Sequence, residues 1–392
     1  MQIHIVDGFE LPSFQPDTVA EACDIVRNHP AIYPIGGGTA LDYGRPPSTP
    51  GVALQTTRWN RVVDYPARDL TITVQAGLTW EALTTVLDTE GQTLPVDMPN
   101  PAQATVGGAV ATNWCGVRRL MHGTLRDYLL GITFISDAGE VIRAGGRVVK
   151  NVAGYDFMKL MTGALGTLGV LTELTFKVKP KPETYAAMIF DLGAAALAPT
   201  LDRLHESNAR PAWVQLRSTP GGWSLACGFE EKEETVRWQL GTLQAELATA
   251  PIRELQLLDS EATCALLRNI RNESAITSRA CFKLNLPPSE VAPAALTIQN
   301  DCPDATIVAH ALSGILFVQL PPEADVALAQ RIQRTLAALT RQGSSNAVVV
   351  RCPTAWKSSL DVWGRDTGDR RVMRAIQQAL DPAGKLNPGR FI

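Results

Sequence analysis

Three consecutive glycines, Gly36, Gly37 and Gly38, directly follow the short apolar run at residues 31–35. Each glycine costs backbone entropy on folding, so a run of three needs a physical reason. A turn without Cβ atoms can present a row of amide N–H groups, and such a row binds phosphate or pyrophosphate. The simpler alternative is a tight turn between two elements. The segment matches neither G-x-x-x-x-G-K-[ST] nor G-x-G-x-x-G, so a P-loop or a Rossmann domain is not indicated.

Two further glycine-rich segments lie downstream. The first reads PNPAQATVGGAVATNWCG, and the second reads VVKNVAGYDFMKLMTGALGTLGVLTELT. The first contains small, hydroxyl and amide residues that allow a flat ligand close to the main chain while offering hydrogen bonds: Thr105, Gly107, Gly108, Thr112 and Asn113. Because the glycines of both segments lack a helical rationale, we favour binding loops over unrelated turns.

Composition excludes several classes of function. The chain has 392 residues, with 45% hydrophobic and 19% charged, as expected for a globular protein of about two domains. A net charge of −3 argues against nucleic acid or an anionic membrane as the main partner. The seven cysteines contain no C-x-x-C pair, so a zinc site or a cysteine-ligated cluster is not indicated. The first residues lack a secretory pattern, and we expect a cytoplasmic protein with reduced cysteines.

Local patterns predict the elements that must position the glycines. Thr18 and Glu21 have the spacing of a capping box and predict a helix that stops before Pro30. From residue 281 the expected order is strand, helix, strand, strand, helix, strand, which is the ferredoxin-like arrangement. No internal repeat is apparent. Further expected elements are strands at 31–35, 70–77 and 170–179, a helix at 79–91 capped by Gly91, and a hairpin at 132–145 with its turn at 137–139.

The three glycine blocks and the closing GKLNPGR resemble the FAD-binding domain of the vanillyl-alcohol oxidase/PCMH flavoprotein superfamily. The likeness covers about residues 15–180 and the C-terminal segment. MHGTLRDYLLG, KNVAGYD and the overall length resemble in particular the FAD-binding E-subunit family of glycolate oxidase. The resemblance implies an α+β fold with three parts: a PCMH-type FAD-binding domain of two subdomains at 1–182, a ferredoxin-like α+β cap domain for substrate or partner at 183–351, and a segment at 352–392 that completes the FAD site.

The resemblance also implies which residues hold FAD. Residues 35–39 should wrap the pyrophosphate, the second block should follow the ribityl chain and isoalloxazine, and the third should contact flavin and adenine. Close packing at Gly163 and Gly166, and a turn cap at Asn387, stay open as simpler roles. The expected cofactor-binding residues are Ile35, Gly36, Gly37, Gly38, Thr39, Ala40, Pro99, Thr105, Gly107, Gly108, Ala111, Thr112, Asn113, Lys150, Asn151, Gly154, Tyr155, Gly166, Gly169, Val170, Thr172 and Asn387.

Two departures from the superfamily pattern bear on the chemistry. Some members attach FAD through a histidine just after the pyrophosphate glycines; Thr39 stands there and cannot form that bond, so we expect dissociable FAD. Relatives that oxidise 2-hydroxy acids carry H-A-G-D-G-N-L-H, whereas residues 310–317 read HALSGILF. The acid, the asparagine and the second histidine are lost, so no metal site is expected. The sequence identifies no catalytic base, and His122 and His310 are each open to a packing or a functional role.

The resemblance therefore implies the FAD-binding subunit of a glycolate oxidase or dehydrogenase complex. A larger D-type flavoprotein subunit would oxidise glycolate to glyoxylate, and an iron–sulfur subunit would carry the electrons onward. The chain would be cytoplasmic, with peripheral membrane association through its partners as an alternative. A self-sufficient FAD-dependent oxidoreductase for another 2-hydroxy acid or alcohol, and a scaffold with a degenerate flavin site, are the other hypotheses. We expect Gly37→Val to lower FAD occupancy more than fold stability.

Overall fold

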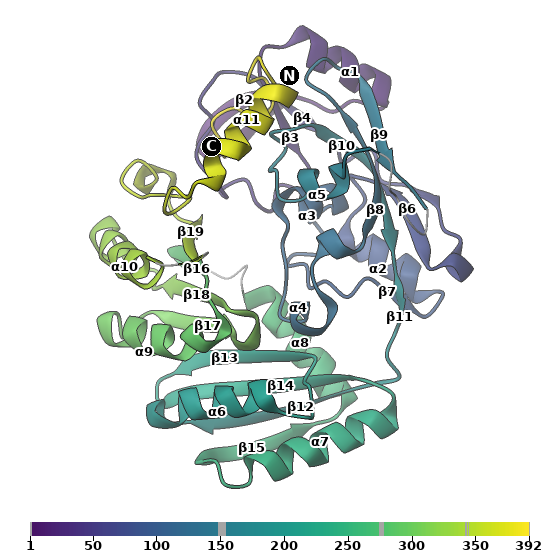
Figure 1. Cartoon of the computed structure of the whole chain (residues 1–392). Coiled ribbons are helices and arrows are strands. Elements are labelled where there is room, and N and C mark those ends of the chain that lie inside the picture. Colours follow the sequence, from purple (N-terminus) through teal and green to yellow (C-terminus); the bar gives the residue numbers. More distant parts are fainter. Residues whose placement is uncertain (1, 148–153, 274–277, 342, 344, 392) are drawn as a thin grey trace. The chain divides into compact units, whose positions relative to one another are not determined.

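The computed structural model describes residues 2–147, 154–273, 278–341, 343 and 345–391. Contacts between residues divide the chain into two compact units (Figure 1). Unit 1 comprises Met1–Cys115, Thr124–Lys181 and Asp366–Ile392, and unit 2 comprises Gly116–Gly123 and Pro182–Arg365. This division differs from the expected one at two places, because residues 116–123 and 352–365 pack with the middle part of the chain.

Unit 1 contains two main sheets. The first consists of β1 (Gln2–Val6), β2 (Phe9–Phe14), β3 (Ile32–Ile35) and β4 (Val52–Gln55). Its strand order is β1-β2-β4-β3, and β2 and β3 both run parallel to β4. The second consists of β5 (Val62–Asp64), β6 (Thr71–Gln75), β8 (Leu129–Ile135), β9 (Val141–Gly145) and β10 (Val170–Lys177). It is antiparallel in the order β5-β6-β10-β8-β9.

The remaining elements of unit 1 are short. The helices are α1 (Val19–Asn28), α2 (Trp80–Asp88), α3 (Val106–Thr112), α5 (Phe157–Met161) and α11 (Asp369–Leu380). Turns of 3-10 helix occur at η1 (Ala67–Asp69) and η2 (Leu125–Asp127). A two-residue strand, β7 (Gln92–Thr93), pairs with β11 (Lys179–Pro180).

Local signals position α1 as predicted. The hydroxyl of Thr18 accepts the N–H of Glu21 at 3.2 Å, and the helix ends at Asn28, before Pro30. The carboxylate of Glu21 accepts from Asp17 rather than from Thr18, so only half of the capping box forms. A cap of this kind contributes about 1 kcal/mol to helix stability.

Alternation along the strands decides which face of the second sheet is buried. Ile72, Val74, Leu174 and Phe176 are fully buried in a core shared with α2, α3 and α5. The strand predicted at 70–77 is confirmed, although it begins later than expected because Leu70 is left-handed at φ 53° and lies outside it.

The hairpin predicted at residues 132–145 is confirmed. Strands β8 and β9 pair with Ile135 opposite Val141, and Gly139 takes φ +72° in the turn. The predicted glycine cap of α2 is wrong in position, because the helix ends at Asp88 with Thr89 as its cap. Gly91, at φ +61°, turns the chain after the helix has ended.

Unit 2 is built on one eight-stranded sheet. Its strands are β12 (Thr184–Leu192), β13 (Trp213–Thr219), β14 (Gly222–Glu231), β15 (Ile252–Leu258), β16 (Ala280–Asn285), β17 (Thr306–His310), β18 (Ile315–Leu320) and β19 (Asn346–Arg351). The order is β15-β12-β14-β13-β17-β18-β16-β19, and all pairs are antiparallel. The helices are α4 (Arg119–His122), α6 (Ala194–Glu206), α7 (Glu233–Leu247), α8 (Ser260–Glu273), α9 (Val291–Asp301) and α10 (Val326–Leu339), with 3-10 turns η3 (Pro288–Glu290), η4 (Ala311–Ser313) and η5 (Thr354–Trp356).

The eight strands form two copies of one arrangement. The series β12-α6-β13-β14-α7-β15 precedes β16-α9-β17-β18-α10-β19, and each follows the ferredoxin-like order. The two copies join through β13 and β17, where Gln215 lies opposite His310. The order predicted from residue 281 is confirmed, whereas the expectation of no internal repeat is wrong. The two series share the order of their strands and helices, and no residue pattern in the sequence indicates this repeat.

Helices cover the two faces of this sheet unequally. α6, α7, α9 and α10 pack against one face (Figure 1). On the other face, α8 and residues 116–123 enclose the fully buried Trp213 together with Val117, Leu267 and Ile270. Gly228 makes room for the indole, since a Cβ there would lie 1.9 Å from Trp213 Cε2.

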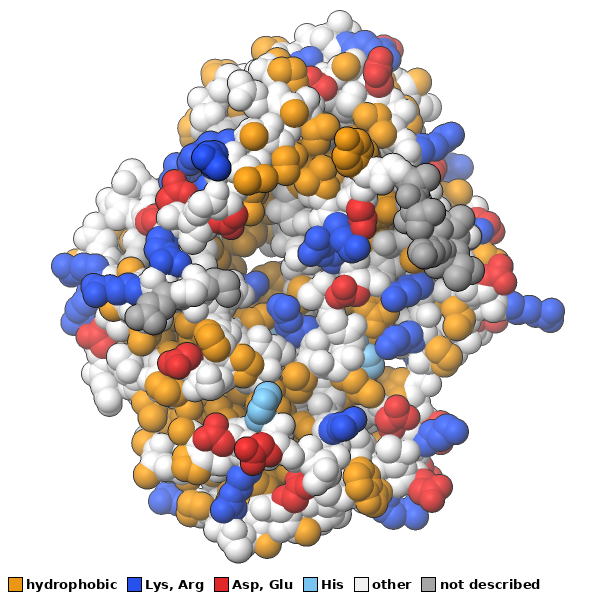
Figure 2. Space-filling view, viewed as in Figure 1, with side chains coloured by type: hydrophobic (Ala, Val, Ile, Leu, Met, Phe, Trp, Pro, Cys, Tyr) orange, Lys and Arg blue, Asp and Glu red, His pale blue; other side chains and the backbone are white. Residues whose placement is uncertain are grey.

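Charges on the visible face of the molecule are mixed in sign. Figure 2 shows lysine and arginine side chains interspersed with aspartate and glutamate, without a continuous basic surface. This distribution agrees with the net charge of −3 and gives nucleic acid no electrostatic footprint on that face.

Candidate functional site

The triple glycine forms a loop whose amides are unpaired. Strand β3 ends at Ile35, and residues 36–40 turn away from the sheet. Within the described part of the chain, the backbone N–H groups of these five residues donate no hydrogen bond to the protein. Gly38 and Thr39 are exposed and their three neighbours are half-buried, so a ligand can reach these amides. A run of free amides at one turn offers a nest for an anion. The loop therefore fits a pyrophosphate group.

The second glycine block uses its amides internally. Thr105 is the N-cap of α3, and its hydroxyl accepts the N–H of Gly108 at 3.2 Å. The N–H of Gly107 donates to Ala76 O at 2.7 Å, and the hydroxyl of Thr112 donates to the carbonyl of Gly108 at 2.9 Å. The start of α3 is therefore not a second phosphate site. Contacts of these residues with the ribityl chain stay predictions.

Gly36 and Gly37 allow the first two blocks to touch. A Cβ on Gly36 would lie 2.1 Å from Thr105 Oγ1, and one on Gly37 would lie 1.7 Å from the backbone oxygen of Gln103. No side chain fits at either position unless the second block moves. The expectation that Gly37→Val lowers FAD occupancy more than stability stays a prediction, and the contact of Gly37 with Gln103 adds a cost in stability.

The third block joins the same cluster through its middle part. The N–H of Gly163 donates to Val110 O, and that of Leu165 donates to Ala111 O, both at 2.9 Å. Gly166, at φ +71°, lies against Pro34 of β3. Asn113 ends α3 in the left-handed conformation, at φ 49°.

Other predicted residues lie away from these loops. Tyr155 is 85% exposed and contacts only the ring of Phe157 among its aromatic neighbours in the described residues. Val170 is fully buried in the core beneath α1, and a Cβ on Gly169 would meet Phe134. Among the described residues, Pro99 and Gly154 form no hydrogen bond with the loops, and Lys150 and Asn151 lie outside that part of the chain.

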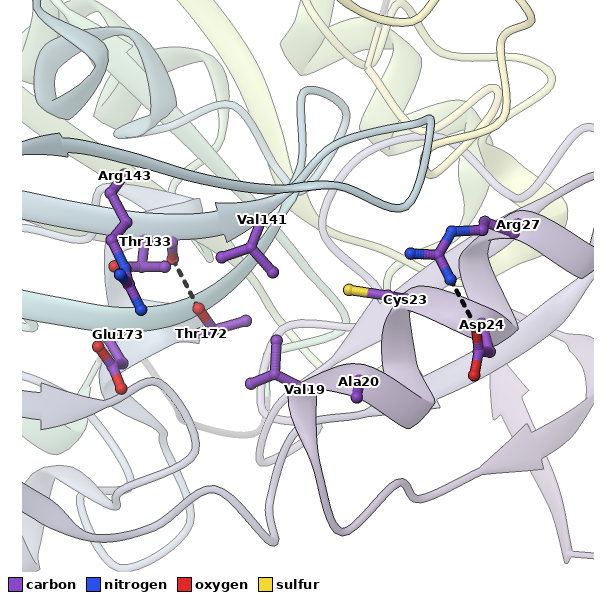
Figure 3. Close-up of a pocket in the computed structure, with 10 residues that line it drawn as sticks. All are labelled: Val19, Ala20, Cys23, Asp24, Arg27, Thr133, Val141, Arg143, Thr172 and Glu173. Atoms are coloured by element: carbon purple, nitrogen blue, oxygen red, sulfur yellow. Dashed lines mark hydrogen bonds and ion pairs between the residues drawn. The ribbon is translucent and has the colours of Figure 1, made fainter.

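Thr172 lines a separate cavity of about 710 Å³ formed by α1 and strands β8, β9 and β10 (Figure 3). Its hydroxyl donates to Thr133 O at 3.0 Å. Arg27 on α1 is paired with Asp24 and also donates to Gly139 O. Thr172 is the single expected cofactor residue among those that line this cavity, so the cavity is distinct from the glycine loops.

Asn387 connects the third glycine block to strand β3, and its side-chain amide is used in this contact. Its side-chain Nδ2 donates to Leu165 O, and its backbone N–H donates to Ile32 O at 2.8 Å. A direct contact with the cofactor stays a prediction. Sequence reasoning missed Arg390, which is 4% exposed and binds the chain just beyond the triple glycine. Its signal was a basic residue at the end of GKLNPGR.

His310 lies in unit 2 as a buried, neutral imidazole. It is 7% exposed, its ring meets that of Phe317 at 5.5 Å, and Nδ1 has no hydrogen-bond partner among the described residues. Burial lowers the pKa of His310 to about 3, and the positive charges of Lys283 and Arg119 act in the same direction. Gly314 closes the adjacent turn at φ +67°.

His122 and Arg118 anchor residues 116–123 to the sheet of unit 2. Nε2 of His122 lies 3.4 Å and Nη1 of Arg118 lies 3.5 Å from Oε2 of Glu230, whose side chain is 2% exposed. Burial alone would raise the pKa of Glu230, but the two basic side chains outweigh it and hold that pKa below its usual value. The position of Glu230 gave no signal in the sequence, since FEEKEE reads as a solvated charge run.

The described residues contain no group of three or more histidine, cysteine, aspartate or glutamate side chains arranged to hold a metal ion. No helix in the described parts of the chain combines the length and the apolar character that crossing a membrane requires.

The fold and the loops define a class. Unit 1 has the PCMH-type FAD-binding architecture, within a chain of mixed α+β structure. A p-cresol methylhydroxylase structure with substrate bound superposes with a TM-score of 0.74 at 16% identity, covering 96% of this chain and 88% of that one. An alkyldihydroxyacetonephosphate synthase gives 0.70 at 18% identity, covering 96% and 76%.

Sequence comparisons agree with this class. Residues 14–145 match the family model described as FAD binding domain. A D-2-hydroxyglutarate dehydrogenase of Xanthomonas citri pv. viticola is 28% identical over 96% of this chain and 88% of the relative. Glycolate oxidase subunit GlcE of Escherichia coli is 40% identical over 38% of this chain and 42% of the relative, and subunit GlcD of Bacillus subtilis is 34% identical over 44% and 37%.

The alignments therefore span less than half the length of each of these two glycolate oxidase subunits. Together, the fold and the match of residues 14–145 identify a PCMH-type FAD-binding domain in this chain, with FAD as its cofactor. The relatives that match include D-2-hydroxyglutarate and D-lactate dehydrogenases.

Proposed function

We propose that the chain binds FAD without a covalent bond and serves in the oxidation of a small 2-hydroxy acid to the 2-oxo acid, as the FAD-binding subunit of a glycolate oxidase complex. The observation that carries the proposal is the row of unpaired amides at residues 36–40, held against α3. Thr39 offers no imidazole for a covalent flavin bond. The partial matches to GlcD and GlcE support glycolate as the substrate class.

The loops of unit 1 would hold the cofactor by its phosphates. The unpaired amides of Gly37, Gly38 and Thr39 would hold the pyrophosphate, and residues of the second and third blocks would hold the rest of the cofactor. When bound, FAD supplies the acceptor for the hydride, which carries both electrons away from the substrate carbon. The chain itself contributes binding and orientation.

In unit 2, one face of the sheet carries charges suited to a hydroxy acid. Lys283 lies opposite Phe317, whose ring packs against His310, and Arg119 is near enough to lower the pKa of that histidine. Lysine and arginine bind carboxylates through charge-assisted hydrogen bonds. An imidazole with a pKa of about 3 is a weak acceptor for a hydroxyl proton at neutral pH. This weakness favours a chain that works beside a catalytic partner.

The partners of this proposal are a larger D-type flavoprotein subunit and an iron–sulfur subunit, in the cytoplasm. None of the seven cysteines forms a disulfide, six of them are buried, and the sequence has no C-x-x-C spacing. Burial raises the pKa of the Cys227 thiol far above its usual value and that of Cys281 to about 12. Electrons leaving the flavin would therefore pass to a cluster on another subunit.

A self-sufficient dehydrogenase is the second candidate. The D-2-hydroxyglutarate dehydrogenase alignment supports it, because it runs over 96% of this chain and 88% of the relative. An enzyme of this kind would carry its own substrate site in unit 2. The two candidates differ in whether the isolated chain is reduced by substrate.

Anaerobic titration separates the candidates. The purified chain, alone and with the larger flavoprotein, is mixed with glycolate, D-lactate or D-2-hydroxyglutarate while the flavin band is recorded. Reduction by glycolate only in the presence of the partner is the expected result. Full reduction of the isolated chain by one of the acids would establish the second candidate instead. A chain that stays colourless after incubation with FAD would contradict both and indicate a degenerate site.

A further inference from the structure

Arg390 forms hydrogen bonds with residues 41–45, the segment that follows the triple glycine. Its guanidinium donates to three carbonyl oxygens, those of Leu41 at 2.6 Å, Tyr43 at 2.8 Å and Arg45 at 2.6 Å. It also donates to the carboxylate of Asp7 at 3.2 Å. The guanidinium side chain is 5% exposed and the aspartate side chain 1%. A planar, multidentate donor of this kind fixes several backbone positions at once.

The backbone next to Arg390 reinforces this contact. The N–H of Arg45 donates to Arg390 O and that of Ser48 donates to Pro388 O, both at 3.1 Å. Gly389 takes φ +83°, and a Cβ there would lie 2.5 Å from the Cβ of Ser48. The two backbones therefore approach as closely as a residue without a side chain permits.

The same segment also holds the chain that enters the triple glycine. The N–H of Ile32 donates to Lys385 O, and the N–H of Asn387 donates to Ile32 O, both at 2.8 Å. Leu386 thus pairs with β3 as a parallel bridge. The carboxylate of Asp381, which is 2% exposed, accepts hydrogen bonds from the amides of Lys385 and Leu386. These bonds fix the start of residues 385–390.

We propose that residues 385–390 form a clasp that holds the pyrophosphate loop in its binding conformation, with Arg390 as the positioning residue. The clasp grips the chain on both sides of residues 36–40 and leaves their amides unpaired. Ordering a glycine-rich loop costs conformational entropy, and a loop ordered beforehand binds its ligand more tightly. The inference rests on the proposed FAD site and adds the element that shapes it.

Exchanging Arg390 tests the clasp. Arg390→Met keeps the length and removes every donor, whereas Arg390→Lys keeps the charge beside Asp7 but cannot reach three carbonyls from one nitrogen. We expect Arg390→Met to weaken FAD binding about tenfold, measured by quenching of flavin fluorescence, and Arg390→Lys to recover part of the loss. The rise in Tm caused by FAD should shrink in the same order.

Gln92→Met is the matched control. Gln92 is also buried in unit 1, where its amide donates to Ala67 O at 2.8 Å, away from the glycine loops. This change should lower the Tm with and without FAD by equal amounts. Equal FAD affinity in Arg390→Met and the wild-type chain would overturn the clasp. A wild-type chain that binds no FAD would overturn the proposed site and the clasp together.

Hydrogen exchange tests the clasp without any substitution. If the clasp and the ligand favour the same loop conformation, each must stabilise the other. FAD should therefore slow exchange at the amides of Ile32, Arg45, Ser48 and Asn387, whose hydrogen bonds form the clasp. Unchanged exchange there, with FAD bound, would contradict the proposal even if Arg390→Met fails to fold.

Discussion

Gly37 and Gly38 are neighbours with different constraints. A Cβ on Gly37 would meet the backbone of Gln103 at 1.7 Å, whereas one on Gly38 would meet only Leu41 Cδ1, at 3.7 Å. The cost at Gly38 is conformational, because its φ is +72°. Adjacent glycines in one motif thus serve two purposes, close packing and a left-handed turn.

We therefore expect Gly37→Ala to lower stability and FAD affinity together, with more than about 2 kcal/mol lost from the free energy of unfolding. Gly38→Ala should cost about 1 kcal/mol and keep most of the FAD affinity. Urea unfolding and flavin fluorescence measure the two quantities. A Gly37→Ala chain of wild-type stability that has lost FAD would restore the simpler interpretation of a pure ligand contact.

His310 should make the chain sensitive to acid. Its pKa is about 3 when folded, against an ordinary value of 6.5, so between these pH values the unfolded chain binds a proton that the folded chain does not. The free energy of unfolding should therefore fall as the pH drops through this window. From pH 7 to pH 5 the wild-type chain should lose about 2 kcal/mol more than His310→Gln.

Unfolding midpoints at the two pH values measure this difference. His205→Gln, on the exposed side of α6, is the control and should show the wild-type pH dependence. If His310→Gln also retains the full wild-type dependence, the histidine is not held neutral.

At the scale of elements, α3 couples helix stability to the cofactor loop. Thr105 caps the helix and also lies beside Gly36. Thr18 caps α1 in the same way, accepting the N–H of Glu21 at 3.2 Å, and belongs to none of the glycine blocks. The two threonines form a matched pair for separating the cap from the loop.

Thr105→Ala and Thr18→Ala should each cost about 1 kcal/mol of stability. Only Thr105→Ala should also weaken FAD binding, since it removes the side chain against which the first block rests. Thermal unfolding and FAD titration of both variants measure this. Equal FAD affinity in the two variants would show that the cap does not support the loop.

The sequence predicted elements that depend on local patterns, but not contacts between residues that are far apart in the chain. The cap of α1, the hairpin of β8 and β9 and the second βαββαβ series follow from patterns within a few residues. The first series was missed because only topology relates it to the second. The bonds of Arg390 and the role of Gly37 were missed because both depend on residues remote in the sequence.

At the scale of the whole molecule, the threonine at position 39 predicts that FAD separates from the polypeptide when the protein is denatured. Acid denaturation should release FAD into solution and leave a colourless pellet, because no imidazole follows the glycines to hold it. Absorbance of the supernatant and of the redissolved pellet measures the partition. Yellow colour that stays with the polypeptide would mean a covalent attachment elsewhere in the chain.

The bond between Arg390 and Asp7 spans 383 positions of the chain. During synthesis, residues 182–365 emerge before residue 390, so unit 2 has the means to fold while unit 1 is still incomplete. Unit 1 closes only when its last strand-pairing residues reach β3, and such distant contacts form slowly. A chain that lacks residues 385–390 would have a folded middle and an open cofactor loop. The flavin then acts as a mark of a closed unit 1, acquired only by chains in which residues 385–390 have reached β3.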